Sequence, residues 1–462
     1  MIFDIDKKSK ESIAIQDDGG NVLQYGEFVN IINQSKGLLS DRSLVIVLAE
    51  NTVDVLSFII TCLEHKWIPL VINKDLDNHL LKNYIDIYKP QVLFTPPNFY
   101  VECQVNKVVP WGQCLINFIS GNKSNFDPKL SFLLPTSGST GSPKLVRHSY
   151  DNLTFSAKSI GEFFELNLQD KALGILPIYY TMGFSVVASH LQAGASIILS
   201  KYSLTEKCFW DILKNEGITV LTGVPYTFEV LFKMRFERVK IPSLRIVTQG
   251  GGKLSDLLWD LLTTYATNNS IEFIPTYGQT EGTARMSYLA SNQVIERKGS
   301  IGKAIPGGFF EIWSEEGKLI KDQVAEGELI YRGRNVTLGY AETLKDLEKG
   351  DERRGILQTG DIVRRDEDGF YYIIGRKKRF LKIFGLRISL DEVELLIKNK
   401  YSIDSYAKGD DSTLEVYITD AAMQEEIKQW LSNRINIFHQ SIQIHYIKEI
   451  PRNASGKVIF AK

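Results

Sequence analysis

Residues 131–144 read SFLLPTSGSTGSPK, in which a short apolar run leads into hydroxyl and glycine residues and then Lys144. Small residues of this kind allow backbone N–H and side-chain O–H groups to surround an oxyanion at close range. Lys144 adds a compact positive charge. The order GSPK differs from a Walker A loop, which needs GK[ST] after its second glycine. The stretch therefore predicts a phosphate-binding loop directly after a strand; a flexible serine–glycine linker is the alternative.

Around this loop, the first 300 residues alternate short apolar runs with helix-like segments. This rhythm favours α/β layers around mostly parallel sheets. From Gly302 to Gly375 the sequence changes to short strands with turn signals, typical of a small antiparallel barrel or sheet. After the basic run RKKR at 376–379, the pattern predicts strand, helix, strand, helix and strand, a small α+β domain. The expected strands are 43–48, 68–71, 91–94, 105–109, 219–221, 243–247, 271–275, 414–418 and 442–447, and the expected helices are 25–39, 51–65, 209–216, 255–265, 390–399 and 423–434.

The segment 172–200 has no Asp, Glu, Lys or Arg and is long enough to span a bilayer. Pro177, Gly183 and Gly194 interrupt it, however. We therefore expect a strand (172–176), a helix (182–192) and a strand (195–199) of a buried parallel sheet rather than a membrane helix.

Composition and charge limit the classes of protein that the chain can belong to. Its 462 residues suggest about three domain-sized units. The 54 Lys+Arg and 55 Asp+Glu leave a net charge of −1, so there is no electrostatic reason to expect nucleic acid as the main partner. The 24 Phe, 20 Tyr and 6 Trp supply enough apolar surface to argue against intrinsic disorder.

The four cysteines, Cys62, Cys103, Cys114 and Cys208, are widely spaced and form no CxxC pair. We expect buried thiols of a reducing compartment, and neither a disulfide framework nor a metal site. The first twelve residues have acids among their lysines and no apolar core, so they do not predict a signal peptide. The expected location is the cytoplasm, with no integral membrane segment.

Four further motifs follow the loop in the chain: YGQTE at 277–281, QTGD at 358–361, GR at 375–376 followed by KIFG at 382–385, and PRNASGK at 451–457. Together with the loop, and in this order, they resemble the adenylate-forming superfamily of acyl-CoA synthetases, carrier-loading adenylation domains and luciferases. The resemblance implies an α/β fold with a large N-terminal domain (1–377) of two α/β layered subdomains and a small β-barrel-like one. A small mobile α+β C-terminal domain (378–462) follows, with the hinge at Lys378. A structural basic linker is the alternative for that position.

The resemblance also implies ATP and Mg²⁺ as cofactors and a role for each motif residue. Glu281 would hold Mg²⁺, since hard cations prefer carboxylate oxygens; a solvated loop acid is the alternative. Thr280 would contact the α-phosphate. Lys457 would reach the bridge between the substrate carboxylate and the α-phosphate, where an ammonium stabilises charge that concentrates in the transition state. These three are the expected catalytic residues, with Glu281 as the metal ligand.

The nucleotide would be held by a larger set of residues. Asp361 would accept from both ribose hydroxyls, with an Asx turn as the alternative, and Arg376 would reach the ribose or the phosphates. Adenine would stack between Tyr277 and the Gly250–Gly252 loop, for which a plain tight turn is the alternative. The expected ATP- and AMP-binding residues are Thr136, Ser137, Gly138, Ser139, Thr140, Gly141, Lys144, Gly250, Gly251, Gly252, Tyr277, Gly278, Gln279, Thr280, Asp361, Arg376 and Lys457.

The expected pocket for the acid contains Tyr180, Gly183, Phe184 and Ser185. Tyr180 takes the place of the histidine in the family's Pro-x-Phe-His, and a core tyrosine is the alternative. Phe184-Ser185 aligns with the Phe-Asp pair that holds the amino group of α-amino acids, and serine supplies no countercharge for an ammonium. The apolar segment 183–190 favours an acyl or aryl carboxylic acid. We expect His190 to be a core histidine rather than a substrate contact.

These observations predict an ATP- and Mg²⁺-dependent ligase that converts a small carboxylic acid to acyl-AMP and then passes the acyl group to a thiol, with CoA as the first choice. Lys382 and Gly385 would line the thiol tunnel. The alternatives are loading of the phosphopantetheine on a separate acyl carrier protein, and amide formation. A nucleotide-binding pseudoenzyme is a more remote reading, and Lys457 argues against it because a non-catalytic binder does not need that lysine.

Overall fold

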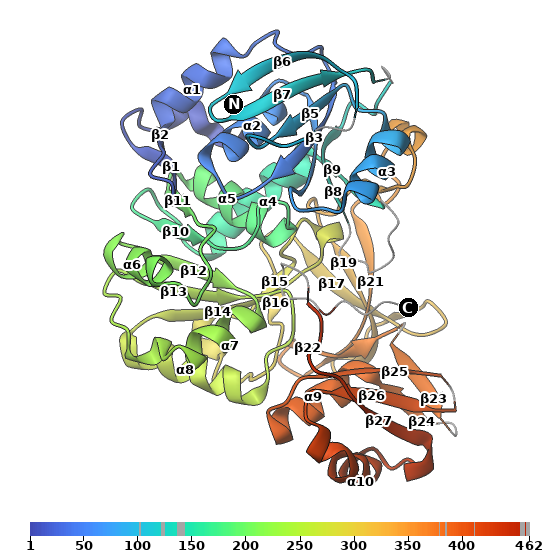
Figure 1. Ribbon diagram of the computed structural model, residues 1–462. Coiled ribbons are helices and arrows are strands. Elements are labelled where there is room, and N and C mark those ends of the chain that lie inside the picture. Colours follow the sequence, from blue (N-terminus) through green and yellow to red (C-terminus); the bar gives the residue numbers. More distant parts are fainter. Residues whose placement is uncertain are drawn as a thin grey trace.

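The computed structural model describes residues 1–100, 103–121, 125–135, 144–377, 379–383, 386–410, 412–452 and 458. Figure 1 shows two α/β layers in the upper and left parts of the molecule, a β-rich part beside them, and a separate C-terminal part below. The α/β class, with a large N-terminal part and a smaller C-terminal one, is confirmed.

The first large sheet has the strand order β16-β15-β14-β13-β12-β10-β11-β1-β2. Its central strands run parallel, and β15, β16 and β2 are antiparallel additions at the two edges. The strands are β1 (Ile13–Asp17), β2 (Val22–Gln24), β10 (Lys171–Gly174), β11 (Ser196–Leu199), β12 (Val220–Gly223), β13 (Ile246–Gln249), β14 (Glu272–Tyr277), β15 (Ser287–Tyr288) and β16 (Lys303–Ala304).

Helix α5 (Thr181–Ala193) connects β10 to the parallel strand β11, so the expected strand–helix–strand in 172–200 is confirmed. In the described part of the chain, no helix is both long and apolar enough to cross a membrane. The outer face of this sheet is covered by α6 (Lys207–Asn215), α7 (Pro225–Lys233) and α8 (Asp256–Asn269).

The second sheet has the order β20-β9-β8-β4-β3-β5-β7-β6, with β3 parallel to both β4 and β5. In β3, Val45 and Val47 face one apolar core and Leu44 and Ile46 face another, which explains its uninterrupted apolar sequence. The strands are β3 (Leu44–Ala49), β4 (Ile68–Asn73), β5 (Val92–Thr95), β6 (Val105–Trp111), β7 (Cys114–Ile119), β8 (Leu130–Pro135), β9 (Leu145–Ser149) and β20 (Gly339–Ala341).

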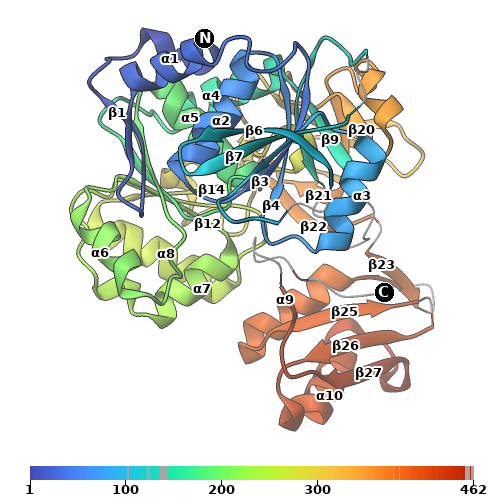
Figure 2. The same ribbon diagram turned by 45° about the horizontal axis from the view of Figure 1, so that its top comes forward.

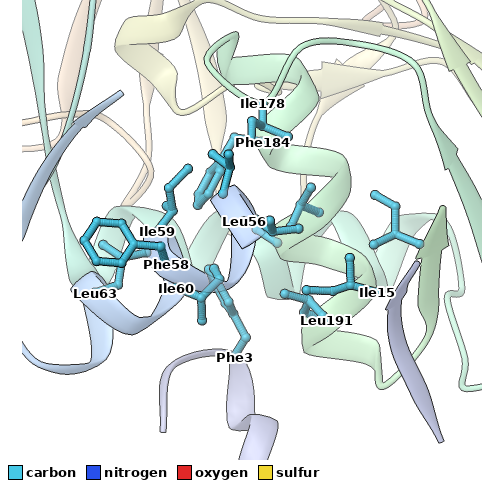
Figure 3. Packing of buried hydrophobic residues seen from close by; sticks show 14 of the residues in the cluster. Phe3, Ile15, Leu56, Phe58, Ile59, Ile60, Leu63, Ile178, Phe184 and Leu191 are labelled. Carbon is cyan, nitrogen blue, oxygen red and sulfur yellow. The ribbon is translucent and has the colours of Figure 1, made fainter. Parts of the chain in front are cut away.

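The largest apolar core lies between the two sheets. Phe3, Leu56, Phe184 and Leu191 meet there from widely separated parts of the chain (Figure 3). The helices that supply this core are α1, α2, α4 and α5, whereas α3 covers the far face of the second sheet. Helix α1 ends five residues earlier than the expected Leu39. The bounds are α1 (Tyr25–Gln34), α2 (Val53–Glu64), α3 (Asn78–Tyr88) and α4 (Tyr150–Phe163).

The region 302–375 contains the expected antiparallel sheet, in the order β18-β17-β19-β21-β22. Strand β21 carries the QTGD motif, whose last residue, Asp361, is paired with Arg376 of β22. The strands are β17 (Phe309–Trp313), β18 (Leu319–Ile320), β19 (Ala325–Arg332), β21 (Ile356–Arg365) and β22 (Tyr371–Arg376).

The C-terminal part has an apolar core of its own and forms a distinct lobe at the lower end of the molecule in both views (Figures 1 and 2). It begins with the β23–β24 hairpin and continues with a β25-β26-β27 sheet covered by two helices. The domain division at 377/378 stays a prediction, because Lys378 lies outside the described residues. The elements are β23 (Phe380–Ile383), β24 (Leu386–Ser389), α9 (Leu390–Tyr401), β25 (Ser405–Gly409), β26 (Leu414–Ile418), α10 (Gln424–Ile435) and β27 (Ile442–Tyr446).

The expectation that all four cysteines are buried is wrong. Cys62 and Cys114 are buried, Cys103 is half-buried and Cys208 is exposed; all four are free thiols. Cys208 lies on the outer face of the amphipathic helix α6, whose neighbouring residue Phe209 faces the core.

Candidate active site

The expected nucleotide residues follow the carboxyl ends of neighbouring parallel strands. Gly250 follows β13 and Tyr277 ends β14; because parallel strands end at the same edge of a sheet, these residues come together there. Thr276 Oγ1 donates to the carbonyl of Gln249 at 3.0 Å. A Cβ atom on Gly250 would lie 2.8 Å from Thr276 Oγ1, so a larger residue would displace the hydroxyl that makes this bond.

The centre of the site is the Asp361 carboxylate, only 2 % exposed. The Tyr277 hydroxyl donates to Oδ2 at 2.5 Å, and Gln279 Nε2 donates to the same oxygen at 2.8 Å. Arg376 lies opposite Asp361 on the paired strand β22, with its Nε 3.2 Å from Oδ1. Residues from three motifs therefore converge on one buried carboxylate.

Burial dominates the electrostatics at this point. It raises the pKa of Asp361 above its ordinary value, although Arg376, Tyr277 and Gln279 each act to lower it. Burial, together with the charge of Asp361, raises the pKa of Tyr277 well above its usual range. Tyr277 is therefore a neutral hydrogen-bond donor, and Asp361 is a carboxylate that gains when further donors reach it.

A second group of residues lies where the phosphates are expected. Lys144 Nζ lies 3.9 Å from the centre of the Tyr340 ring and 3.3 Å from Glu342 Oε1. The Tyr340 hydroxyl donates to Glu281 Oε1 at 2.7 Å. Tyr340 therefore connects the expected phosphate-loop lysine to the expected metal ligand.

Glu281 is suited to a hard cation. Its backbone carbonyl accepts from both the N–H and the hydroxyl of Thr337 at 3.0 Å, which fixes the main chain. In the described part of the chain, no donor reaches its second carboxylate oxygen, Oε2. A carboxylate with one oxygen held by Tyr340 and the other available fits Mg²⁺, which prefers oxygen ligands.

The YGQTE loop is tightly constrained. A Cβ on Gly278 would lie 1.6 Å from the carbonyl oxygen of Ala284, so only glycine fits there. Thr283 and Ala284 have positive φ angles of 48° and 77°, which are costly for residues with a side chain. Asn335 holds this conformation by donating to the carbonyls of Gly282 and Arg285 at 2.7 and 3.1 Å. Strain of this kind persists only where surrounding contacts overdetermine it.

Thr280 is oriented by the first residue of α5. The Thr181 hydroxyl donates to Thr280 Oγ1 at 3.0 Å. Because Thr280 accepts this bond, its own proton remains available for another acceptor, such as a phosphate oxygen. The helix expected to line the acid pocket is therefore linked directly to a residue expected to contact the phosphate.

The residues expected to form the acid pocket have different surroundings. Tyr180 lies at the nucleotide side, where a Cβ on Gly251 would be 2.8 Å from its hydroxyl, and burial raises its pKa to about 12. A Cβ on Gly183 would lie 2.2 Å from the carbonyl oxygen of Pro177, so Gly183 allows close packing at the start of α5. Phe184 stacks on Phe132 of β8 at 4.6 Å and belongs to the core between the sheets (Figure 3).

Ser185 Oγ donates to the carbonyl of Met182 at 2.7 Å, within its own helix. Ser185 and Phe184 border a narrow cavity of about 10 Å³, roughly the room that one water molecule needs. His190 is a buried core histidine, as expected: its Nδ1 is 2.8 Å from the carbonyl of Val186, and burial lowers its pKa to about 4.

Residues 5–341 match the model of a known family, described as AMP-binding enzyme. The chain belongs to this family. Among its relatives, the indoleacetate–CoA ligase of Aromatoleum aromaticum is 25% identical, over 94% of this chain and 91% of that protein. A 2-succinylbenzoate–CoA ligase of Bacillus cereus is 28% identical, over 71% of this chain and 68% of that protein.

Solved structures confirm the fold of this AMP-binding enzyme. The o-succinylbenzoate CoA synthetase of Bacillus subtilis, in complex with the acyl-adenylate intermediate OSB-AMP, superposes with a TM-score of 0.79 at 19% identity and covers 98% of this chain and 96% of that one. The anthranilate CoA ligase AuaEII, in complex with anthranoyl-AMP, also gives 0.79 at 19% identity, over 99% and 95% of the two chains. The resemblance stated from the motifs is confirmed.

Several expected site residues of this AMP-binding enzyme lie outside the described residues: Thr136, Ser137, Gly138, Ser139, Thr140, Gly141, Lys378, Gly385 and Lys457, together with the side chain of Lys382. Their roles stay predictions. Conversely, sequence reasoning missed Tyr340, Thr181 and Asn335. No local pattern marks them, because each joins the site through a partner at least 50 residues away in the chain.

Proposed function

We propose that this AMP-binding enzyme activates a small carboxylic acid with ATP and Mg²⁺ and transfers the acyl group to the thiol of CoA. The observation that carries the proposal is the buried Asp361 carboxylate, held by Tyr277, Gln279 and Arg376 as an acceptor for the ribose hydroxyls. The matched relatives are named as CoA ligases, which supports CoA as the acceptor.

In the first step, a carboxylate oxygen of the acid attacks the α-phosphorus of ATP, the bond to the bridging oxygen breaks, and pyrophosphate leaves. Mg²⁺, when bound, neutralises phosphate charge. Within the chain, Glu281 holds the cation, Lys144 and the hydroxyl of Thr280 contact phosphate oxygens, and Lys457 stabilises charge between the two anionic reactants.

In the second step, the thiol sulfur attacks the acyl carbon, the bond to AMP breaks, and AMP leaves with the electron pair while the thiol proton passes to solvent. We propose that the C-terminal domain (378–462) turns about Lys378 between the steps, so that Lys457 withdraws and the loop with Lys382 and Gly385 lines the thiol tunnel. The change of position is needed because the two steps place different groups around one adenylate.

The proposed acid is an acyl or aryl carboxylic acid rather than an α-amino acid. Ser185 stands where a countercharge would be needed, and its hydroxyl is already bonded to the carbonyl of Met182. The proposed location is the cytoplasm, since four free thiols are typical of a reducing compartment. Transfer to an acyl carrier protein or to an amine is the alternative fate of the acyl-AMP.

The test is acid-dependent pyrophosphate release over a panel of aliphatic and aromatic acids, with hydroxylamine to trap acyl-AMP. Adding CoA, or a phosphopantetheine-loaded carrier protein, to the acids that respond then identifies the acceptor. We expect thioester with CoA. Pyrophosphate release from none of the acids, with AMP binding intact, would instead favour the pseudoenzyme reading.

Two variants test the residue roles. Lys457→Ala should reduce adenylation by about 10²- to 10³-fold, as for the loss of a group that stabilises developing charge. Lys378→Pro should slow thioester formation more than adenylation. Untouched adenylation in the first variant, or equal slowing of both steps in the second, would contradict the assigned role.

A further inference from the structure

An ion pair and a hydrogen-bonded pair connect the C-terminal part to helices α7 and α8. Lys398, near the end of α9, places its Nζ 3.1 Å from Glu229 Oε1 in α7 and 2.8 Å from Asp404 Oδ1 in its own domain. Beside it, Asp256 at the start of α8 donates its N–H to Asn399 Oδ1 at 2.9 Å, and Asn399 Nδ2 donates to Asp256 Oδ2 at 3.0 Å. The two domains thus meet through directional polar contacts.

The same charges extend to the segment that carries the terminal lysine motif. Asp404 Oδ2 lies 3.3 Å from the Arg452 guanidinium, which in turn lies 5.8 Å from the ring centre of Tyr226 in α7. Arg452 also forms a β-bridge with Val458. The contacts of Arg452 with Asp404 and Tyr226 are therefore made by a residue of the terminal lysine motif itself.

We name Glu229, Lys398, Asp404, Arg452 and Tyr226 the α7 network. Each of its charged side chains is between 18% and 31% exposed. Water therefore screens these ion pairs less than it screens pairs on the open surface. Although burial lowers the pKa of Lys398, its contacts with Asp404 and Glu229 raise it overall, so this lysine stays charged.

The place of the α7 network indicates which half-reaction it serves. Helix α7 begins at Pro225, whose ring lies beside Gly252: a Cβ on that glycine would be 3.1 Å from Pro225 Cγ. The network thus brings Arg452 to the edge where the nucleotide residues gather. The β23–β24 hairpin, by contrast, lies at the side of the C-terminal part away from α7 in both views (Figures 1 and 2).

We propose that the α7 network is a positioning device for adenylation. It holds α9 and Arg452 against α7 during the step for which Lys457 is proposed, and it must separate before the thiol step. Glu229 and Lys398 are positioning residues: they act through the orientation of the C-terminal part. The inference rests on the proposed function for its kinetic consequence, but the interface itself can be tested without activity.

The kinetic test uses Glu229→Gln, which removes the charge on the N-terminal side of the pair and nearly preserves its shape. We expect the adenylation kcat to fall about fivefold, in line with the coupling of a partly screened pair, with little change in the KM for ATP. Transfer from isolated acyl-adenylate to CoA should be unchanged or faster. Equal slowing of both half-reactions, or no slowing of adenylation, would overturn the proposal.

The matched control is Glu237→Gln, whose carboxylate pairs with Arg235 and Arg238 of its own segment and not with the C-terminal part. This variant should behave as wild type in both half-reactions. In the Lys398→Gln background, Glu229→Gln should slow adenylation much less than it does in the wild-type chain. Such non-additivity would show that the pair itself matters, whereas additive losses would contradict the assigned coupling.

The structural test measures domain orientation by spin-label distances between Leu168→Cys and Phe438→Cys, two exposed positions, with Cys103 and Cys208 changed to serine. We expect Glu229→Gln to broaden or shift the distance distribution and Glu237→Gln to leave it unchanged. An unchanged distribution in Glu229→Gln would overturn the network. If the wild-type chain releases no pyrophosphate with any acid, the proposed function fails and this measurement alone decides the interface.

Discussion

The Asp361→Asn substitution separates the cost of burying a carboxylate from its value to a bound nucleotide. A carboxylate offers about four acceptor positions, and three are in use by Tyr277, Gln279 and Arg376. Two ribose hydroxyls therefore need at least one present donor to turn away. The Arg376 side chain, 61% exposed, is the donor that can do so at least cost.

The expected loss of affinity follows from the change in bond type. Hydrogen bonds to a charged group are worth roughly 1.5–3 kcal/mol each, against about 0.5–1.5 kcal/mol for neutral ones. When Asn replaces the charged acceptor of two ribose hydroxyls, AMP binding should lose about 2–3 kcal/mol. This loss weakens the binding roughly 30- to 150-fold. Calorimetric titration of AMP at pH 7 measures this directly.

Unfolding of the ligand-free protein should respond differently. Because burial raises the pKa of Asp361, the folded state binds this proton more tightly than the unfolded state. Wild-type stability therefore falls as pH rises from the ordinary pKa of an aspartate through the raised one, and Asp361→Asn removes this loss. Above that window, the melting temperature of the variant should therefore equal or exceed that of wild type.

The control for this substitution is Asp368→Asn, in the turn between the same two strands but 54% exposed and paired with Arg297. It should leave AMP binding unchanged. An AMP dissociation constant for Asp361→Asn within threefold of wild type would refute Asp361 as the ribose acceptor, whatever the effect on stability.

Two other perturbations follow from the site and the core. Thr181→Val removes the hydrogen bond to Thr280 and should lower the adenylation kcat about tenfold, with a small effect on the KM for the acid. Thr181→Ser keeps a hydroxyl and should retain most of the rate. Equal rates in the two variants would contradict the proposal that Thr181 orients Thr280. Burial lowers the pKa of His148 to about 3 and that of His190 to about 4, so as the pH falls the unfolded state takes up these two protons before the folded state does. Between pH 6.5 and 5.5 the two histidines together should therefore lower the free energy of unfolding by ~2 kcal/mol. Denaturant titrations should find that about half of this loss is absent in His190→Gln.

Much of the fold could be predicted from short-range patterns. The strand 414–418 has the expected bounds, and the helix expected at 390–399 is observed at Leu390–Tyr401. Alternating burial and helix capping are decided within a few residues, so the sequence carries them locally. The expectation that Cys208 is buried failed because its burial is not decided locally. It depends on which side of α6 packs against the sheet.

The motifs on their own determined the chemistry of this protein, because glycines, carboxylates and lysines at fixed spacing limit what a loop can bind. Only the tertiary structure decided which side chains support them. Tyr340 reaches Glu281 because β20 pairs with β9, almost two hundred residues earlier in the chain. Glu229 reaches Lys398 because two separately folded parts meet. Such contacts depend on sheet order and domain orientation, which are set by the burial of whole apolar faces. The sequence next to a contacting residue therefore does not indicate which distant residue it will meet.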